Sequence, residues 1–157
     1  MKKTELKLRP IGYVSSKFQN PKNLEFACEK GLSAKTTSKL IIRDEFLTGL
    51  DGLKKFSHLW IIYYLHKANR IESKTYPGPS SVKNLPKTGI FATRSQYRPN
   101  HIALRLTKIK KIGENTIEVI GLDAVDGSPI LDIKPYVSYF DRPKNFKTAS
   151  WYRGWNI

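Results

Sequence analysis

The chain of 157 residues contains few of the residue types that form disulfides or metal centres. Its single cysteine, Cys28, cannot form an internal disulfide, which fits a reducing compartment, so we expect a cytoplasmic protein. The three histidines are scattered along the chain without the spacing of metal ligands. The sequence therefore indicates neither a disulfide scaffold nor a catalytic metal site.

Long hydrophobic segments are also missing. The longest apolar run, Leu59 to Leu65, is too short to cross a bilayer, and the basic N-terminus lacks the apolar stretch of a signal peptide. No G-x-G-x-x-G motif follows a predicted strand, so a Rossmann-type cofactor site is not expected. We expect a soluble protein without a membrane partner, built as one domain over 1–157 with its core in 6–141 and a basic, aromatic tail in 142–157.

Acidic residues are scarce, with 13 Asp and Glu against 28 Lys and Arg, and the formal net charge is +15. A surface of this charge concentrates polyanions such as nucleic acids. No acid follows Asp141. Four cations alternate there with four aromatic residues: Arg142, Lys144, Phe146, Lys147, Trp151, Tyr152, Arg153 and Trp155. Rings that stack on bases beside cations that pair with phosphates are typical of single-strand binding, although the rings could equally dock the tail on the core.

Short runs of β-forming residues, separated by turn residues, predict a mainly β fold. Strands are expected at 6–14 with a bulge at Pro10, and at 40–46, 57–66, 102–112, 116–122 and 129–133. Residues 20–31 are expected to be irregular, 49–55 to form a short helical turn and 69–88 to form a long loop. In 102–112 we expect Arg105 on an exposed, basic outer face. This pattern predicts a small β-barrel with few short helices.

Two stretches concentrate the candidate functional residues. Residues 89–104 set Arg94 and Arg98 four positions apart, with Tyr97 between them and Pro99 stiffening the segment. Planar guanidinium groups bind carboxylates, phosphates and aromatic rings, so this pattern favours a binding site. Residues 122–136 gather Asp123, Asp126 and Asp132. Turn chemistry explains part of this run, but Asp123 and Asp132 lie in or beside apolar runs, where a carboxylate needs a partner.

The order of several sequence blocks resembles the TrmO/TsaA-like methyltransferases. The blocks are PIGYV at 10–14, GLDGLKKFSHLW at 49–60, GIFATRSQYRPNHIAL at 89–104 and LDAVDGSPILDIKPY at 122–136. The resemblance runs from about Pro10 to Asp141. It implies a small β-barrel that binds S-adenosylmethionine, usually as a homodimer. It also implies a tRNA partner and N6-methylation of threonylcarbamoyl-adenosine, the modified nucleotide next to the anticodon.

The resemblance also implies a set of cofactor contacts. These are His66, Lys67, Arg94, Leu104, Asp123, Ala124, Val125, Asp126 and Gly127. The residue types fit such a ligand: Arg94 suits its carboxylate, Leu104 the adenine, and Asp123 or Asp126 its hydroxyls or amine. His58, in contrast, is expected to be structural.

On the substrate side we expect Tyr97 to stack on a base, Arg98 to pair with a phosphate, and Asn100 to line the same surface. Methyl transfer is an in-line displacement, so alignment of the two reactants can supply several kcal/mol of the rate. A base that takes the N6 proton is not identified by the sequence. Asp126 and Asp132 are candidates on charge alone.

The chain departs from the family pattern in several places. Residues 20–31 lack the usual glutamine-proline-glycine turn, 76–80 replace an arginine-proline-proline-arginine loop, and His101 stands in place of a proline. Bacterial members also carry a further C-terminal domain that helps to hold tRNA. Three functions remain open: a tRNA methyltransferase, a non-catalytic RNA-binding barrel, and a methyltransferase of the same fold with another substrate.

Overall fold

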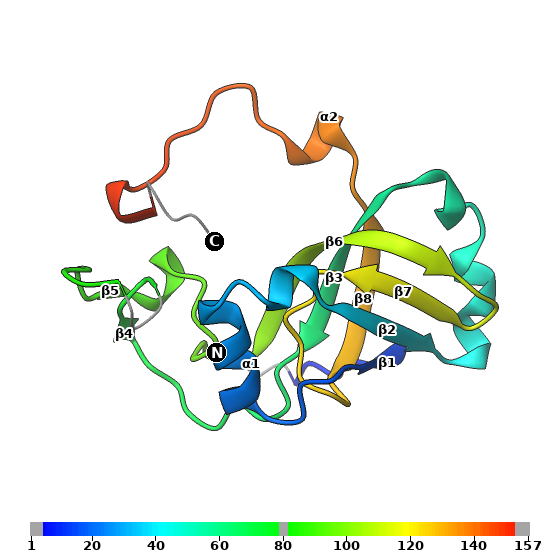
Figure 1. The fold of residues 1–157 in the computed structure, drawn as a ribbon, viewed down its shortest axis with the longest axis horizontal. Coiled ribbons are helices and arrows are strands. Elements are labelled where there is room, and N and C mark those ends of the chain that lie inside the picture. The colour runs from blue at the N-terminus through cyan, green and yellow to red at the C-terminus, as the bar shows by residue number, and fades with distance from the viewer. Residues whose placement is uncertain (1–4, 79–81, 153–157) are drawn as a thin grey trace.

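The computed structural model describes residues 5–78 and 82–152. Six antiparallel strands form a closed barrel in the order β1-β2-β7-β6-β3-β8 (Figure 1). The strands are β1 (Gly12–Ser15), β2 (Thr37–Ile42), β3 (His58–Tyr64), β6 (Ile102–Ile112), β7 (Thr116–Ile120) and β8 (Pro129–Pro135). The prediction of a mainly β barrel with few short helices is confirmed.

The core fills the barrel with alternate side chains of neighbouring strands. On β3, Leu59, Ile61 and Tyr63 point inward and are almost fully buried, and Leu40 on β2 and Ile117 on β7 meet them there. Burial of one such side chain stabilises the fold by about 1.5–3 kcal/mol. These β-branched, aromatic and leucine residues at every second position are the reason that the segments form strands.

Strand β6 has the predicted bounds but not the predicted face. Arg105 lies opposite Ile61, and Thr107 lies opposite Leu59, so both share the inner face with buried residues of β3. Ile102 and Leu104 instead point outward and are 37% and 43% exposed. The prediction that Arg105 lies on the outer face is therefore wrong. A partly buried guanidinium needs polar partners, and Arg105 finds them in a carboxylate and a carbonyl at the barrel end.

All predicted strands other than 102–112 have different bounds in the structure, and the first two differ most. Residues 6–11 do not belong to a strand, because β1 begins at Gly12. An added Cβ at Gly12 would lie 2.2 Å from the Ile41 carbonyl oxygen, so this close approach of β1 to β2 requires glycine. The second strand covers 37–42 rather than 40–46, and the chain then turns into the 3₁₀ helix η2 (Asp44–Leu50).

The prediction of irregular structure at 20–31 is wrong. Helix α1 (Pro21–Glu29) occupies this segment. The Asn20 side chain accepts a hydrogen bond from the Asn23 N–H at 2.9 Å, and Pro21 occupies the first helical turn. Both are ordinary helix-start signals, and they outweigh the weak apolar pattern of the segment.

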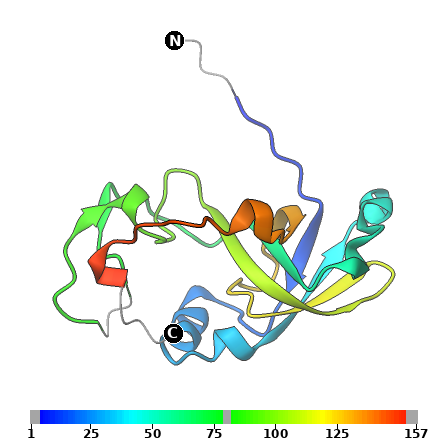
Figure 2. The same cartoon turned by 90° about the horizontal axis from the view of Figure 1, so that it is seen from above.

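The remaining elements are short. The 3₁₀ helices η1 (Ser33–Lys35) and η3 (Leu53–Lys55) connect barrel strands, and η3 lies in the predicted helical turn. Residues 69–88 are not entirely loop, because β4 (Lys74–Thr75) pairs with β5 (Thr88–Gly89), followed by η4 (Ile90–Ala92). This pair lies apart from the barrel, and the described chain after α2 (Ser138–Asp141) extends toward it as far as η5 (Ser150–Tyr152) (Figures 1 and 2). Over 5–78 and 82–152, no helix has the length and apolar character to cross a membrane.

Candidate functional site

One end of the barrel gathers most of the predicted cofactor residues around the loop after β7. The Asp126 carboxylate accepts a hydrogen bond from the Ser16 N–H at 2.9 Å, and the Gly127 N–H donates to the Val14 carbonyl at 2.8 Å. These bonds join the loop at 121–128 to the end of β1. Gly127 has a φ of +77°, a conformation that favours glycine, and an added Cβ there would lie 3.9 Å from His66 Nε2. The loop is therefore built against the end of β3.

His66 and Lys67 follow β3 and contact two other segments. Nδ1 of His66 lies 3.4 Å from the Ser128 hydroxyl. Partial burial lowers the pKa of His66, the neighbouring Lys67 lowers it further, and Asp126 opposes both effects. The imidazole is thus neutral near pH 7. The Lys67 ammonium donates to the Gln19 carbonyl at 2.6 Å, which ties the end of β3 to the segment that leads into α1.

Asp123 belongs to a polar cluster at the inner edge of the same barrel end. Its carboxylate accepts a hydrogen bond from the Tyr63 hydroxyl at 2.9 Å and lies 3.5 Å from Arg105, which also donates to the Gly121 carbonyl. Burial, and then the charge of Asp123, raise the pKa of Tyr63 well above its ordinary value, so the phenol stays protonated as a donor. This cluster supplies the partner that the sequence demanded for Asp123.

Ala124 and Val125 have their side chains in the core, with 0% and 8% exposure. Any contact that these two residues make with a ligand would therefore come from their backbone. The side chains of Ala124 and Val125 are therefore not available to a ligand, unlike that of Asp126.

Arg94 and Leu104 form a second group at the same end of β3 and β6. The Arg94 guanidinium donates to the Leu104 carbonyl at 3.1 Å. The Leu65 N–H donates to the His101 carbonyl at 2.8 Å, which keeps the end of β3 beside the start of β6. Within the described ranges no hydrogen bond or ion pair joins Arg94 to Asp123. The structure thus brings the predicted cofactor residues to one end of the barrel, in two groups.

A polar pocket of about 470 Å³ connects a predicted cofactor residue with a predicted substrate residue. It is lined by Asn20, Pro21, Lys22, Asn23, Lys67, Ala68, Asn69, Gln96 and Tyr97. The Arg70 guanidinium lies 3.8 Å from the centroid of the Tyr97 ring, and it also pairs with Glu72 at 3.2 Å. Arg70 thus occupies one face of the ring, and stacking on a base would have to use the other face.

The other predicted substrate residues have structural partners. Nη1 of Arg98 donates to the carbonyls of Ile90 and Thr93 at 3.2 and 2.8 Å, so this guanidinium closes the η4 turn. The Asn100 carbonyl accepts from the Ile102 N–H, and the residue is exposed. The roles predicted for Arg98 with phosphate and for Asn100 with substrate stay predictions.

Asp132 lies on the barrel wall, with Ile62 of β3 between it and Leu104, and makes its ion pair outside these groups. It is on β8 opposite Ile62, and its carboxylate pairs with Lys134 at 2.8 Å. His58 stacks edge-on with Tyr136 at 6.5 Å and lies 2.8 Å from the neighbouring Ser57 hydroxyl, in keeping with a structural role. In the described part of the chain, no three His, Cys, Asp or Glu side chains are arranged to hold a metal ion.

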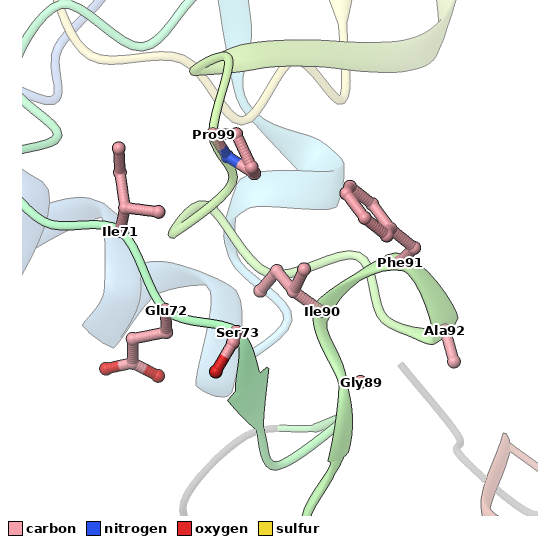
Figure 3. Close-up of a pocket in the computed structure, with 8 residues that line it drawn as sticks. All are labelled: Ile71, Glu72, Ser73, Gly89, Ile90, Phe91, Ala92 and Pro99. Carbon is pink, nitrogen blue, oxygen red and sulfur yellow. The ribbon is translucent and has the colours of Figure 1, made fainter.

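The structure adds an apolar pocket of about 490 Å³ that the sequence did not indicate (Figure 3). Its lining consists of Ile71, Glu72, Ser73, Gly89, Ile90, Phe91, Ala92 and Pro99. Phe91 is 77% exposed and lies on the opposite side of the pocket from Glu72 and Ser73. Phe91 directly follows the pocket residue Ile90 in the block that carries Arg94. The sequence signal for this pocket was therefore Phe91, a large apolar residue in the polar block at 89–104.

Comparison with known proteins identifies the family. Residues 13–142 match the family described as the tRNA-methyltransferase O N-terminal domain. The tRNA (adenine(37)-N6)-methyltransferase of Mus musculus is 37% identical over 140 residues, which cover 87% of this chain and 32% of that protein. A probable S-adenosyl-L-methionine-binding protein of Methanothermobacter thermautotrophicus is 38% identical over 141 residues, covering 90% of this chain and 97% of that protein.

Solved structures support the same family. A crystal structure of TrmO from Pseudomonas aeruginosa superposes with a TM-score of 0.72 at 29% identity, covering 94% of this chain and 63% of that one. This chain therefore spans less than a third of the mouse protein and under two thirds of the bacterial one, but nearly all of the archaeal relative. The barrel and its loops at 89–104 and 121–128 lie within the matched residues, and the chain belongs to the family of the tRNA-methyltransferase O N-terminal domain.

Proposed function

We propose that this protein is an S-adenosylmethionine-dependent tRNA methyltransferase that acts on N6 of an adenine next to the anticodon. The main support for this proposal is the arrangement of the predicted cofactor residues. The loop at 121–128, the end of β3 and the start of β6 bring the predicted cofactor residues to one end of a barrel of this family. The charge of +15 supports a polyanionic acceptor.

The residues at this barrel end suit the cofactor chemically. S-adenosylmethionine supplies a methyl group that is activated by a positive sulfur. Arg94, exposed beside Leu104, offers a guanidinium for the carboxylate, and the 43% exposed Leu104 side chain offers an apolar surface for the adenine. The half-buried carboxylate of Asp126 offers an acceptor for a hydroxyl or an amine.

The neutral state of His66 also fits a cationic ligand. A protonated imidazole beside Lys67 would add a second positive charge and repel the sulfonium. Because burial and Lys67 both lower the pKa of His66, the ring carries no charge near pH 7. The barrel end therefore presents carboxylates and a neutral ring to the donor.

Of the two candidate bases, we propose Asp126. Asp132 pairs with Lys134 on the outer face of β8, so its carboxylate already has a cationic partner there. Asp126 interacts electrostatically with His66 and accepts from the Ser16 N–H. A carboxylate among the cofactor residues is better placed to accept the N6 proton than one paired on the barrel wall.

Threonylcarbamoyl-adenosine is the proposed acceptor, and the proposed location is the cytoplasm, which fits the single cysteine. The test is nucleoside mass spectrometry of tRNA from a strain that lacks the gene. Loss of the N6-methylated form, restored by the wild-type gene and not by an Arg94→Ala copy, is the expected result. Unchanged methylation would contradict this acceptor and favour a methyltransferase of the same fold with another substrate.

Binding of the cofactor is tested separately by calorimetry with S-adenosylmethionine. We expect heat of binding with the wild-type protein and a strongly reduced affinity with Arg94→Ala, because the variant loses the partner of the cofactor carboxylate. No heat with the wild-type protein would favour the non-catalytic RNA-binding barrel.

We also propose a homodimer. The outer face of β3 and β6 is apolar, with Tyr64, Ile102 and Leu104 exposed by 40%, 37% and 43%. Leu104 on this face is also a proposed cofactor contact, so a second copy packed here would help to enclose the site. Light scattering should give the mass of two chains for the wild type and of one chain for Ile102→Asp. A monomeric wild type would contradict the dimer.

A further inference from the structure

The segment after the barrel carries aromatic rings that the core does not cover. Tyr139, Phe140 and Phe146 are 88%, 79% and 79% exposed. Trp151 and Tyr152 are half-buried instead, and the Trp151 ring nitrogen is fully enclosed. Packing against neighbouring residues therefore covers part of the last two rings of the described tail but not of the first three. Single exposed rings are ordinary on surfaces, whereas three within eight positions call for a ligand.

Helix α2 holds the first two rings in a defined arrangement. The Asp141 carboxylate accepts from the Val137 N–H at 2.7 Å, and the Arg142 N–H donates to the Ser138 carbonyl at 3.2 Å. These bonds fix the turn on both sides. The rings of Tyr139 and Phe140 lie edge to face at 5.3 Å and 82°. Each ring thus keeps an open face, set at an angle to that of its neighbour.

The charge of the segment excludes most other partners. Arg142, Lys144 and Lys147 are exposed, and no acid follows Asp141, whose carboxylate is used within the turn. A second copy of this chain packed on the same rings would bring these cations against their own copies, which is unfavourable. Phosphate groups spaced between bases match the alternation of cations and rings.

The path of the segment places it between two parts of the molecule. From α2 the described chain passes toward the β4–β5 pair and reaches η5 beside it (Figures 1 and 2). The β4–β5 pair is followed directly by the loop at 89–100, which carries Tyr97 and Arg98. A strand of RNA along the segment would therefore run toward the proposed substrate residues.

We propose that residues 139–147 bind single-stranded RNA, with Tyr139, Phe140 and Phe146 stacking on unpaired bases and Arg142, Lys144 and Lys147 pairing with phosphates. The identity of this RNA as the anticodon loop of the acceptor tRNA rests on the proposed function. The stacking itself does not.

The test measures binding of a short unstructured RNA by fluorescence anisotropy, with a blunt duplex of the same sequence as the comparison. Phe146→Ala should weaken binding of the single strand roughly tenfold, because one stacked base is lost. Phe146→Trp keeps a ring and should bind as the wild type does. Tyr13→Ala removes a ring that is 39% exposed on β1, opposite Pro129 and so at the other end of β8 from the tail, and should leave RNA binding unchanged.

A second pair of variants separates stacking from charge. Lys144→Ala with Lys147→Ala should reduce the slope of log K against log salt by about 0.7 for each lost phosphate contact. Tyr139→Ala with Phe140→Ala should weaken binding of the single strand and leave that slope unchanged. If the ring variants bind the single strand as the wild type does, or weaken the duplex equally, the proposal is wrong.

Two controls keep this outcome distinct from the proposed function and from self-association. Light scattering of the Tyr139→Ala, Phe140→Ala, Phe146→Ala protein should give the wild-type mass, and a change of mass would assign the rings to a contact between copies and overturn the proposal. Calorimetry with S-adenosylmethionine should be unaffected by these changes. A wild type that binds no cofactor, but whose ring variants lose the RNA, would contradict the proposed function and leave the RNA-binding segment standing.

Discussion

Two residues at the barrel end, His66 and Asp123, show how neighbours set the charge or the position of a functional side chain. His66 is held neutral by partial burial and by Lys67, while Asp123 is held in place by the Tyr63 hydroxyl and Arg105. The sequence named both residues, but the identity of their partners depends on segments that are far away along the chain. Their chemistry is therefore best tested through those partners.

The first prediction concerns pH. Since the pKa of His66 lies below its ordinary value of 6.5, the ring becomes protonated only as the pH falls below that value, and its charge then repels the cofactor cation. Affinity for S-adenosylmethionine, measured by calorimetry from about pH 7 to about pH 5, should decrease toward acid. The sign for folding is the same: a lowered pKa in the folded state means that stability is lost as the pH drops below 6.5.

The control is His66→Gln, which has no group that titrates in this range. Its affinity should be nearly flat between the same two pH values. An equal decrease in the variant would show that another group is responsible.

The second prediction concerns Tyr63. Tyr63→Phe removes the hydroxyl that donates to Asp123 at 2.9 Å and leaves a partly buried carboxylate with fewer partners. The free energy of unfolding in urea should decrease by about 1–3 kcal/mol. Tyr64→Phe, a change of the same chemistry on a ring that is 40% exposed, should leave it within about 0.5 kcal/mol of the wild type. Equal effects of the two changes would contradict the structural role of this hydroxyl.

At the scale of elements, α1 and the β1–β2 contact illustrate two local requirements. Asn20 caps the N-terminus of helix α1, and Pro21 follows it in the first turn. The segment before the helix is held by the hydrogen bond from Lys67 to the Gln19 carbonyl. Strands β1 and β2 approach so closely at Gly12 that no side chain fits. The first requirement is readable from sequence, and the second becomes visible only when the two strands are paired.

The third prediction tests the helix cap. Asn20→Ala removes the acceptor for the Asn23 N–H and should lower the free energy of unfolding by about 1 kcal/mol. Asn20→Asp keeps an acceptor oxygen and should remain near the wild type in the same urea titration. If both variants lose the same stability, the effect does not come from the cap.

The fourth prediction tests the strand contact. Gly12→Ala places a Cβ 2.2 Å from the Ile41 carbonyl oxygen, so β1 must shift away from β2, and we expect a loss of about 1–3 kcal/mol or more. Gly49→Ala adds a methyl group with no atom within 4 Å and should have a small effect. Thermal unfolding should show a clearly lower melting temperature for Gly12→Ala than for Gly49→Ala. A wild-type melting temperature for Gly12→Ala would contradict the close packing of β1 and β2.

At the scale of the whole molecule, the net charge and the buried core determine different properties. The barrel depends on buried apolar side chains, whereas the net charge of +15 acts on partners. The fifth prediction follows: RNA affinity of the wild-type protein should fall steeply and linearly in log K against log salt, while the free energy of unfolding changes little over the same range. A flat salt dependence of RNA binding would remove the electrostatic argument.

How much could be foreseen varies between neighbouring segments. The bounds of β6 and the position of β3 followed from β-branched and aromatic residues bounded by turns. The helix at 21–29 was missed, although Asn20 and Pro21 carried its start signals, because its apolar pattern is weak. The family motifs indicated Arg94, Leu104 and the loop at 121–128, and these do lie at one end of the barrel. The apolar pocket beside Phe91 was not predicted, and its sequence signal was a single large apolar residue within a polar block.

The sequence by itself determined that the chain forms short strands, that it is strongly basic, and which blocks of residues relate it to its family. Local preference and composition suffice for these properties, because they depend on neighbours in the chain or on sums over it. Only the tertiary structure decided that Arg105 faces inward to meet Asp123, that Arg98 closes a turn, and that the tail leaves Tyr139, Phe140 and Phe146 uncovered. An alternating strand can present either face to the core, and the choice depends on pairing and on bulges such as those at Ile62/Tyr63 and Ile109/Lys111.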